Sequence, residues 1–381
     1  MKTILVIAGT RPEVIKLAPV YTQAVQRFGA EAVEWVNSGQ HTTLADLALE
    51  AFGIQPGTVL KSMTTDGSLG VLSCNLISEL DRLFASVTPE AVVVQGDTTT
   101  AFAGALVAFY HRIPCVHVEA GLRSFDCSNP FPEEANRRMI SSLASIHCAP
   151  TPRAAENLRR EGVAEERILV TGNTVVDAVN HVREKLLQAP QPADAQRRIL
   201  VTMHRREVWG DEMEKMCVAL RELADSRANV EIDFPVHLNP RVREPVHRLL
   251  GKHPRIHLLA PLDYLGLQKM LSQSYLVLTD SGGIQEEAPS YGVPVLVLRR
   301  LTERPEAVEQ GYAQVTGTDP ATLVRAAQRL IDDPEAYRLM VAPANPFGDG
   351  HAAARIVQAM SELLSRQSAK SEHSTLAAAM E

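Results

Sequence analysis

The sequence lacks long apolar runs. Among its 381 residues no window approaches the ~18 consecutive apolar residues that a transmembrane helix requires. The short apolar run at the N-terminus is followed at once by Arg11 and Pro12, where a signal peptide would need a longer apolar region and a small-residue cleavage site. The sequence therefore predicts a cytoplasmic protein with no membrane insertion.

Cysteine is scarce as well, with five residues, an odd number, at wide spacings and without a C-x-x-C pair. These cysteines predict neither a disulfide framework nor a zinc site, and buried thiols are the simplest interpretation. The twelve histidines include no H-E-x-x-H motif and no cluster with the spacing of metal ligands. We therefore expect no metal and no cofactor.

An excess of positive charge is also missing. Lys and Arg total 38 against 45 Asp and Glu, so the formal net charge is −7, which argues against a nucleic-acid partner. Apolar residues make up 45% and charged residues 22%, which excludes a disordered chain, a collagen-like fibre and a small disulfide scaffold. At ~150 residues per domain, the length suggests two or three domains.

Short β-branched runs alternate with longer amphipathic stretches. Expected strands cover 3–8, 91–95, 115–118, 199–202, 230–234, 256–259, 275–279 and 295–298. Expected helices cover 13–28, 69–86, 99–111, 132–144, 212–226, 284–291 and 320–332. Continuous apolar strands followed by helices predict α/β domains with parallel sheets and right-handed crossovers.

A stretch rich in Pro, Ala and Gln at 184–197 marks the expected boundary between two doubly wound domains. We expect a first Rossmann-like domain over 1–185 and a second over 198–350. A C-terminal helix is expected over 351–366. The last segment, 367–381, is polar and aperiodic, which predicts a disordered tail.

Two turns have the composition of anion sites. In GTRPE, positions 9–13, a glycine and Arg11 follow a strand, and the backbone N–H groups of the helix start could bind an anion; an ordinary βα turn is the alternative. In DSGG, positions 280–283, two glycines let the backbone approach a ligand closely. This sequence is neither a G-x-G-x-x-G fingerprint nor a P-loop, which disfavours dinucleotides and ATP.

The DSGG turn favours a nucleotide. A diphosphate would lie on Ser281, Gly282 and Gly283, and a carboxylate of the following helix would bind ribose hydroxyls. The alternative is that Glu286 and Glu287 are first-turn acids that stabilise the helix dipole.

Three carboxylates stand where strands end or a helix begins: Asp97, Glu119 and Glu133. Because the carboxyl ends of parallel strands line one crevice, all three could face the same cleft, and crowding would separate their pKa values. Asp97 could instead cap the helix that opens at Thr98, and Glu133 could be a first-turn helix acid. Glu119 has no such alternative, and an unpaired buried carboxylate would cost free energy.

The second half supplies cationic groups. His204 and His237 follow two expected strands, and Arg304 lies in the sequence TERPE. Arginine suits phosphate because its fork matches phosphate oxygens. For Arg206 and Arg243 a solvated charged surface is the alternative interpretation.

With these residues in place, the sequence resembles the bacterial non-hydrolysing UDP-N-acetylglucosamine 2-epimerases from Thr3 to about Met360. The resemblance rests on a series of motifs in order: GTRPEVIKLAP, SGQH, GDTTT, HVEAGLRS, PFPEEANRR, VTGNTVVDA, HRRE, VHLNPRVREP, TDSGGIQEEAP, TERPEAVE and NPFGDG. It implies an α/β GT-B arrangement: two Rossmann-like domains with an interdomain active-site cleft, and a C-terminal helix that crosses back to the first domain.

The resemblance also implies an activity: reversible epimerisation at C2 of UDP-GlcNAc to UDP-ManNAc, without an external cofactor, in a homodimer. Its mechanism would be anti elimination of UDP to 2-acetamidoglucal, followed by re-addition. By motif match, Asp97, Glu119 and Glu133 would be the catalytic carboxylates, with the identity of the base left open. The other implied site residues are Arg11, Lys16 and His204 as cationic groups, Ser281, Gly282 and Gly283 on the diphosphate, Glu287 on the ribose, and His237 and Arg304 in substrate binding.

The sequence departs from the family pattern at several positions. Thr43 and Gly67 replace two glutamines that contact an activating second UDP-GlcNAc in relatives, which puts substrate activation in doubt. Leu267 replaces an aromatic near uracil, and Arg300-Leu301 replaces an Asp-Thr pair. A modified UDP-N-acetylhexosamine therefore stays open as the substrate. A GT-B glycosyltransferase using a UDP-sugar donor is the alternative from another class, and an inactive UDP-sugar sensor is a third.

Overall fold

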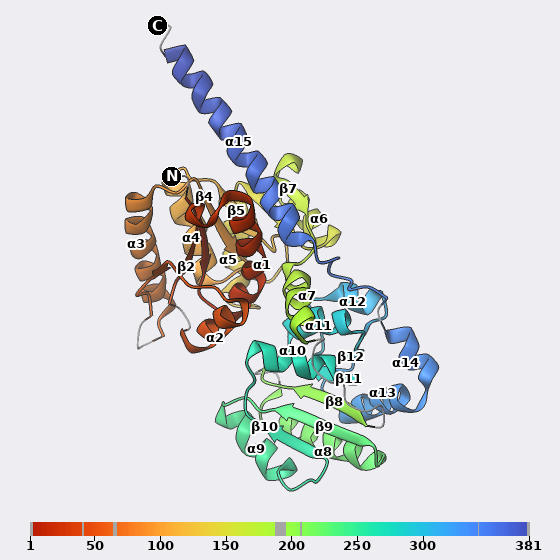
Figure 1. Ribbon diagram of the computed structural model, residues 1–381. Coiled ribbons are helices and arrows are strands. Elements are labelled where there is room, and N and C mark those ends of the chain that lie inside the picture. The colour runs from red at the N-terminus through yellow and green to blue at the C-terminus, as the bar shows by residue number, and fades with distance from the viewer. Residues whose placement is uncertain are drawn as a thin grey trace. The chain divides into compact units, whose positions relative to one another are not determined.

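The computed structural model describes residues 3–39, 42–63, 67–186, 196–205, 208–341 and 343–378, with side chains at 42–44, 185 and 368–378 left aside. The chain divides into two compact units (Figure 1). Unit 1 combines Met1–Ala178 with Gly348–Glu381, and unit 2 is Val179–Phe347. The division falls inside a helix, α7 (Thr174–Leu186), rather than at the predicted 185 and 198. Residues 187–195 of the predicted linker lie outside the described residues.

Within the described part of unit 1, seven parallel strands form one sheet in the order β3-β2-β1-β4-β5-β6-β7. These strands are β1 (Ile4–Ala8), β2 (Val33–Asn37), β3 (Thr58–Val59), β4 (Ala91–Gln95), β5 (Cys115–Val118), β6 (Ile146–Ala149) and β7 (Ile168–Val170). The order reverses direction between β1 and β4, which is the topological switch point of a doubly wound sheet.

The helices of unit 1 are α1 (Arg11–Phe28), α2 (Thr42–Phe52), α3 (Leu69–Val87), α4 (Thr99–Tyr110), α5 (Glu133–Leu143), α6 (Pro152–Arg160) and α15 (Ala352–Ala378), with short 3₁₀ turns at Ala30–Ala32 and Glu165–Arg167. Helices α3, α4 and α5 pack side by side, and α1 packs against α2 and α15 (Figure 1). In α3, Leu72, Leu76, Leu80 and Phe84 recur every fourth residue, and this spacing buries one face of the helix.

Helix α4 lies unusually close to the sheet. A Cβ built on Gly104 would approach Cγ1 of Val94 to 2.9 Å, so only glycine allows this approach. The buried face of α4 is otherwise mostly alanine. Close packing of α4 against β4 fixes the turn between them, where Asp97 lies.

The described residues of unit 2 repeat the same plan with six parallel strands in the order β10-β9-β8-β11-β12-β13. These strands are β8 (Arg197–Thr202), β9 (Val230–Pro235), β10 (Ile256–Leu259), β11 (Leu276–Thr279), β12 (Val295–Val297) and β13 (Ala313–Val315). The switch point here lies between β8 and β11. The prediction of an α/β protein with two doubly wound parallel sheets is confirmed.

The helices of unit 2 are α8 (Asp211–Ser226), α9 (Pro240–Leu250), α10 (Tyr264–Ser272), α11 (Gly282–Glu287), α12 (Pro305–Glu309), α13 (Pro320–Asp332) and α14 (Pro334–Met340), with a 3₁₀ turn at Ala288–Tyr291 after α11. Helix α8 packs against α9 and α13. Its Leu220 and Leu223 join Ile199 and Val201 of β8 in the core of this unit.

Helix α15 continues to Ala378, beyond the segment 351–366 over which a C-terminal helix was expected. The polar composition of this segment suggested disorder, but it contains no Gly or Pro that would end a helix. The N-terminal part of α15 packs on α1 and belongs to unit 1.

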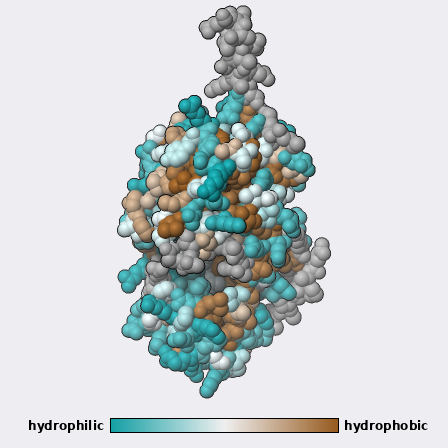
Figure 2. All heavy atoms as spheres, turned by 90° about the vertical axis from the view of Figure 1, so that its left-hand side faces the viewer, coloured by the Kyte–Doolittle hydropathy of each residue, from teal (hydrophilic) through white to brown (hydrophobic). Residues whose placement is uncertain are grey.

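Apolar side chains are interspersed with hydrophilic ones on the face that Figure 2 presents. Single exposed apolar side chains of this kind are normal for folded proteins. Among the described helices, none is long and apolar enough to cross a bilayer.

Candidate active site

The switch points of the two sheets carry most of the predicted site residues. In unit 1, GTRPE follows β1 and Asp97 follows β4. In unit 2, His204 follows β8 and Asp280 follows β11. Ligands of doubly wound sheets bind in the crevice outside the carboxyl ends of strands at this point. Each unit is therefore organised for ligand binding at the end predicted from the sequence.

Glu119, directly after β5, is the most constrained carboxylate of unit 1. Its φ of +61° lies in the left-handed region, which costs a non-glycine residue about 1–3 kcal/mol. Its Oε1 lies 2.5 Å from Nζ of Lys16 and accepts a hydrogen bond of 3.3 Å from Nδ2 of Asn173. Its Oε2 accepts a hydrogen bond from Nε2 of Gln95, the last residue of β4. These contacts hold a strained, buried carboxylate beside a buried ammonium group.

Asp97 lies close to the other two predicted carboxylates. Burial is the main cause that raises its pKa to about 6, and the charges of Glu119 and Glu133 raise it further against the opposing charge of Arg137. Its Oδ2 is 2.6 Å from Nη2 of Arg137. Asp97 does not cap α4, because the Thr98 hydroxyl accepts the hydrogen bond from the backbone N–H of Ala101. The structure thus removes the capping alternative and supports the predicted crowding.

Glu133 is the first residue of α5, which agrees with the alternative that it is a first-turn helix acid. Its Oε2 is buried and has no hydrogen-bond partner among the described residues. A buried carboxylate oxygen without a partner is costly unless a ligand or a proton satisfies it. The first-turn position and a role in the site are therefore compatible for this residue.

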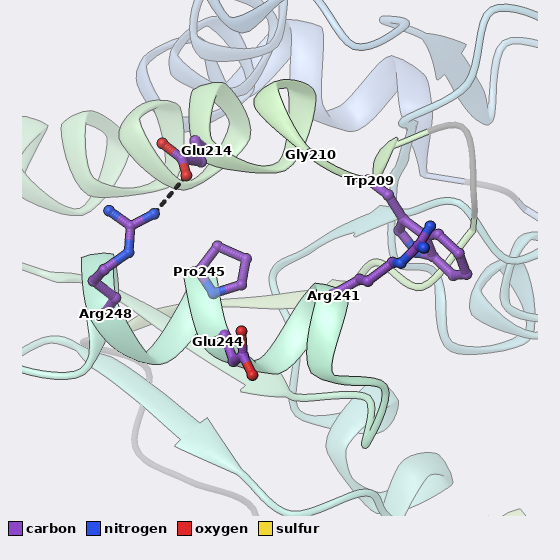
Figure 3. Close-up of a pocket in the computed structure, with 7 residues that line it drawn as sticks. All are labelled: Trp209, Gly210, Glu214, Arg241, Glu244, Pro245 and Arg248. Atoms are coloured by element: carbon purple, nitrogen blue, oxygen red, sulfur yellow. Dashed lines mark hydrogen bonds and ion pairs between the residues drawn. The ribbon is translucent and has the colours of Figure 1, made fainter.

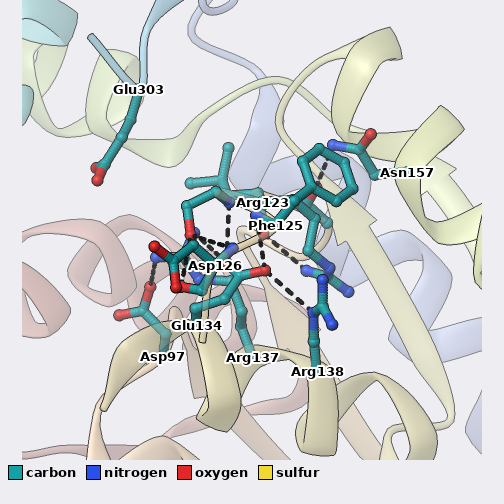
Figure 4. A network of polar contacts seen from close by, with 12 residues as sticks. Asp97, Arg123, Phe125, Asp126, Glu134, Arg137, Arg138, Asn157 and Glu303 are labelled. Atoms are coloured by element: carbon teal, nitrogen blue, oxygen red, sulfur yellow. Dashed lines mark hydrogen bonds and ion pairs between the residues drawn. The ribbon is translucent and has the colours of Figure 1, made fainter. Parts of the chain in front are cut away.

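Glu134, next to it, is completely buried and organises the loop after β5 (Figure 4). Its carboxylate accepts the backbone N–H groups of Ser124 at 2.9 Å and Phe125 at 3.2 Å. It also lies 3.4 Å from Nη1 of Arg137 and 3.1 Å from Nε of Arg138. The Arg137 guanidinium consequently links Glu134 to Asp97, and the network connects the loop to the predicted acid.

Glu13 takes the anion position that the sequence assigned to a ligand. Its Oε2 accepts hydrogen bonds from the backbone N–H groups of Gly9 at 3.1 Å and Thr10 at 2.8 Å. Its Oε1 accepts the hydroxyl of Thr98 at 2.6 Å. The backbone N–H groups of Gly9 and Thr10 are therefore bound to Glu13, and anion binding at this turn stays a prediction. Arg11, the first residue of α1, is partly exposed.

Burial raises the pKa of Glu13 to about 7, although its hydrogen bonds with Thr98 and Thr10 and the two backbone N–H groups oppose this shift. The spacing T-x-x-E at 10–13 is that of a capping box, and this signal could have identified the role of Glu13 from the sequence.

In unit 2, Asp280 organises His204. Nδ1 of His204 lies 3.0 Å from Oδ1 of Asp280, and Oδ2 accepts the backbone N–H groups of His204 at 2.7 Å and Arg205 at 2.8 Å. Burial would raise the pKa of Asp280, but the bonds from His204 and the two backbone groups outweigh it and lower the pKa. The ring of His204 stacks on that of His237 with a centroid distance of 5.9 Å.

The DSGG turn leads into α11, which begins at Gly282 with Ser281 as its N-cap. A Cβ built on Gly282 would lie 3.8 Å from the Arg304 guanidinium, so this cation lies against the start of α11. Arg304 also forms an ion pair with Glu286. The structure therefore brings Gly282 and Arg304, two of the predicted substrate-binding residues, close together.

Glu286 and Glu287 are not first-turn acids. Helix α11 ends at Glu287, so both carboxylates lie at its C-terminal end, and the dipole alternative is wrong. Oε2 of Glu287 accepts a hydrogen bond of 2.7 Å from Nε2 of the buried Gln268. Oε1 of Gln268 in turn accepts the hydroxyl of Tyr291 at 3.0 Å. Two neutral donors in series thus orient Glu287.

Elsewhere in unit 2, a hollow of about 490 Å³ lies between α8 and α9 (Figure 3). The Arg241 guanidinium stacks over the ring of Trp209 at 5.3 Å, and Arg248 pairs with Glu214 at 2.5 Å. No predicted site residue lines it. The charges of Arg248 and Glu214 compensate each other there.

Several contributors were not predicted, among them Glu13, Gln95, Glu134, Arg137, Asn173, Gln268 and Asp280. Gln95 and Asp280 lie at strand ends, and this position in the sequence could have identified them as site residues. Thr43 lies where side chains are not described, and Gly67 has a positive φ of 66°, so the expectation about substrate activation stays a prediction. Leu267 lies in α10, and the expectation about the uracil contact also stays a prediction.

The two doubly wound units, with acids at one switch point and a His–Asp pair at the other, define an α/β protein of the nucleotide-binding type. The family model for UDP-N-acetylglucosamine 2-epimerase matches residues 23–361. The chain belongs to this family, which confirms the resemblance seen in the sequence.

Relatives match over almost the full chain. The UDP-N-acetylglucosamine 2-epimerases of Salmonella typhimurium and Bacillus subtilis are 44% and 43% identical, with 94% and 93% of this chain covered and 98% and 94% of the relatives. The crystal structure of the Neisseria meningitidis UDP-GlcNAc 2-epimerase bound to UDP-GlcNAc is 40% identical, with a TM-score of 0.89 over 95% of this chain and 100% of that one. S. aureus MnaA in a co-structure with UDP is 42% identical, with a TM-score of 0.87 over 96% and 97%.

Proposed function

We propose that the protein interconverts UDP-GlcNAc and UDP-ManNAc by elimination and re-addition of UDP. The observation that carries this proposal is the coupling of three carboxylates in unit 1, where Glu119 and Glu133 help burial to raise the pKa of Asp97 to about 6. A group with that pKa can both accept and donate a proton near neutral pH.

In the proposed elimination, a carboxylate of this cluster removes the C2 proton. The electrons of the C2–H bond form the C1–C2 double bond, and the bond from C1 to the UDP oxygen breaks, so UDP leaves with that electron pair. Re-addition of UDP to C1 of the 2-acetamidoglucal, with protonation of C2 from the opposite face, gives the epimer. Each face of C2 needs its own proton donor or acceptor, and a cluster of acids can supply both.

The C2–H bond is a poor acid because no carbonyl activates it, so the base must be held in place. Glu119 fits this requirement, since Lys16, Gln95 and Asn173 all contact its carboxylate. Lys16 also supplies positive charge next to the acids. We leave the identity of the base among the three carboxylates to experiment.

For unit 2 we propose that it binds the UDP part of the substrate. Ser281, Gly282 and Gly283 would carry the diphosphate, with Arg304 against the helix start. Glu287 would bind the ribose hydroxyls. Preorganised donors and cations stabilise the charge that develops on a leaving UDP.

The remaining cations share this task in the proposal. His204 and Arg11 would meet the diphosphate or the sugar as charge develops, and His237 would contribute to substrate binding. The bound UDP-GlcNAc of the Neisseria meningitidis relative and the UDP of S. aureus MnaA support a nucleotide sugar as the ligand.

NMR of the purified protein with UDP-GlcNAc in D2O, without acceptor or cofactor, tests the function. We expect UDP-ManNAc with deuterium at C2. Free ManNAc and UDP would indicate hydrolysis after elimination, which contradicts re-addition. If UDP-GlcNAc is unchanged, the proposed substrate is wrong, and a panel of UDP-sugars with and without acceptors would separate a modified sugar from a glycosyltransferase.

We further propose that the protein acts in the cytoplasm as a homodimer. Light scattering on the purified chain tests the oligomer, since a dimer would have twice the 41.6 kDa mass of one chain. Fractionation of cells that express the protein tests its location.

A further inference from the structure

The stacked histidines of unit 2 have different fixed partners. Nδ1 of His204 is 3.0 Å from the carboxylate oxygen Oδ1 of Asp280. A nitrogen lone pair at this distance from a carboxylate would be repelled, and the buried Oδ1 of Asp280 has no other hydrogen-bond partner among the described residues, which together favour a proton on Nδ1. In the neutral ring of His204, Nε2 is then the atom without a proton.

His237 has the opposite arrangement. Its Nδ1 accepts the backbone N–H of Asn239 at 3.1 Å, so in the neutral ring the proton lies on Nε2. Partial burial, with the neighbouring His204, lowers the pKa of His237 and favours this neutral form, although Asp280 opposes the shift.

We propose that Asp280 is a positioning residue that fixes His204 in the Nδ1–H tautomer, so that His204 and His237 offer a ligand one accepting and one donating Nε2. Among the described residues, neither Nε2 has a hydrogen-bond partner. The pair therefore suits a phosphate group with one protonated oxygen: Nε2 of His237 donates to an ionised oxygen, and Nε2 of His204 accepts the hydrogen bond of the protonated one.

The contacts of Asp280 suit this positioning role. It is fully buried, and its second oxygen accepts two successive backbone N–H groups, those of His204 and Arg205. The same carboxylate thus fixes the backbone and the ring of His204 together. The identity of the ligand as the UDP diphosphate rests on the proposed function, whereas the assignment of the two histidine tautomers does not.

Two-bond ¹H–¹⁵N correlation spectra of the full-length protein labelled with ¹⁵N-histidine test the inference. The signals of His204 and His237 are assigned by their loss in His204→Gln and His237→Gln. In the neutral rings we expect His204 protonated on Nδ1 and His237 on Nε2. The opposite tautomer for His204 in the unmodified protein would overturn the proposal, and this measurement needs no variant that might misfold.

Asp280→Asn supplies the second arm. Its amide oxygen can still accept the two backbone N–H groups, while its NH₂ group faces Nδ1 and requires the lone pair there. We expect the His204 proton to move to Nε2 and kcat to fall about 100-fold, with a much smaller change in KM. An unchanged His204 signal in this variant, or unchanged kcat, would contradict the role of Asp280.

His253 and Asp225 form a matched control pair on the surface of unit 2, with Nε2 of His253 3.0 Å from Oδ1 of Asp225. Asp225→Asn should affect the His253 signal alone and leave turnover unchanged. If the protein does not epimerise UDP-GlcNAc but the tautomers are as stated, the proposed function fails and the inference about Asp280 stands. If it does epimerise and His204 carries its proton on Nε2, the inference alone fails.

Discussion

The carboxyl groups at the two switch points have opposite protonation behaviour. In unit 1, burial raises the pKa of Glu13 to about 7 and that of Asp97 to about 6. In unit 2, the bonds that Asp280 accepts from His204 and the backbone outweigh burial and lower its pKa. The same fold thus keeps one set of acids ready to exchange protons and holds another permanently charged.

The cause of this difference is the number and kind of donors that each acid receives. Asp97 shares a single guanidinium with Glu134 and lies near two other carboxylates, so part of its charge is uncompensated. Asp280 accepts hydrogen bonds from two backbone N–H groups and lies 3.0 Å from Nδ1 of His204. Acids that exchange protons suit the sugar chemistry, whereas fixed charges suit the orientation of groups that bind UDP.

The largest effect should come from neutralising an acid of unit 1. In Glu119→Gln the ion pair with Lys16 is lost and the carboxylate that could exchange a proton is gone, so kcat should fall at least ~100-fold. Asp97→Asn and Glu133→Gln should act in the same way. Deuterium incorporation at C2 of UDP-GlcNAc measures each loss.

The control for these variants is Glu165→Gln, which changes an exposed acid paired with Arg159 and should leave turnover unchanged. Near-normal activity in all three acid variants would contradict the assignment of these carboxylates to the active site.

Glu13→Gln tests the proton-exchanging character of unit 1 through stability. The folded pKa of Glu13, about 7, exceeds its ordinary 4.5, so its contribution to the free energy of unfolding is complete below pH 4.5 and is lost as the pH rises through about 7. The amide keeps an acceptor for the turn and a donor toward Thr98. We therefore expect the variant to be more stable than the wild type at pH 8 by up to about 3 kcal/mol, with little difference near pH 4.5.

Urea unfolding at several pH values measures this difference. Glu165→Gln should keep the pH dependence of the wild type. A Glu13→Gln variant that is less stable by the same amount at every pH would mean that the carboxylate is ionised throughout.

In unit 2, changing an acid should affect binding more than turnover. Glu287→Gln can still accept the hydrogen bond from Gln268, but its amide NH₂ replaces the oxygen that would accept ribose hydroxyls. We expect KM and the Kd for UDP to rise about 10-fold, with kcat nearly unchanged. Titration calorimetry with UDP measures the Kd, and the exposed Glu222→Gln is the control. A loss in kcat alone would break the division of roles between the units.

The sequence predicted the fold class and the central strands of both sheets, because continuous apolar strands such as β4 and β11 can be recognised from their composition. It also located Asp97, Glu119 and His204, since strand ends in a doubly wound sheet converge on one edge. The strands β2, β3, β6, β7 and β13 were missed; in β3 and β13, two or three residues carry no periodicity.

The partners of the site residues could not be predicted in the same way. Lys16 and Glu119 lie 103 positions apart, and only the packing of α1 on the sheet brings them within 2.5 Å. Two local contacts could not be foreseen in this way either: Glu13 binds the backbone N–H of Gly9, and Glu287 lies at the end of α11 rather than in its first turn. Local rules describe each turn, whereas pairing across turns depends on the whole sheet.

The smallest predicted effect concerns Arg137, a cation that moderates the pKa of Asp97. Arg137 lowers the pKa of Asp97 against burial and against two neighbouring carboxylates, so Arg137→Gln should raise that pKa further. If ionised Asp97 is the form that reacts in the free enzyme, the acidic limb of the kcat/KM profile should move to higher pH by about one unit. Arg138→Gln is the matched control, because Arg138 pairs with the same Glu134, and the described contacts of Arg138 do not include Asp97. A limb that stays in place in Arg137→Gln would mean that Asp97 does not set the proton balance of unit 1, and the comparison would then rest on Glu119 and Glu133.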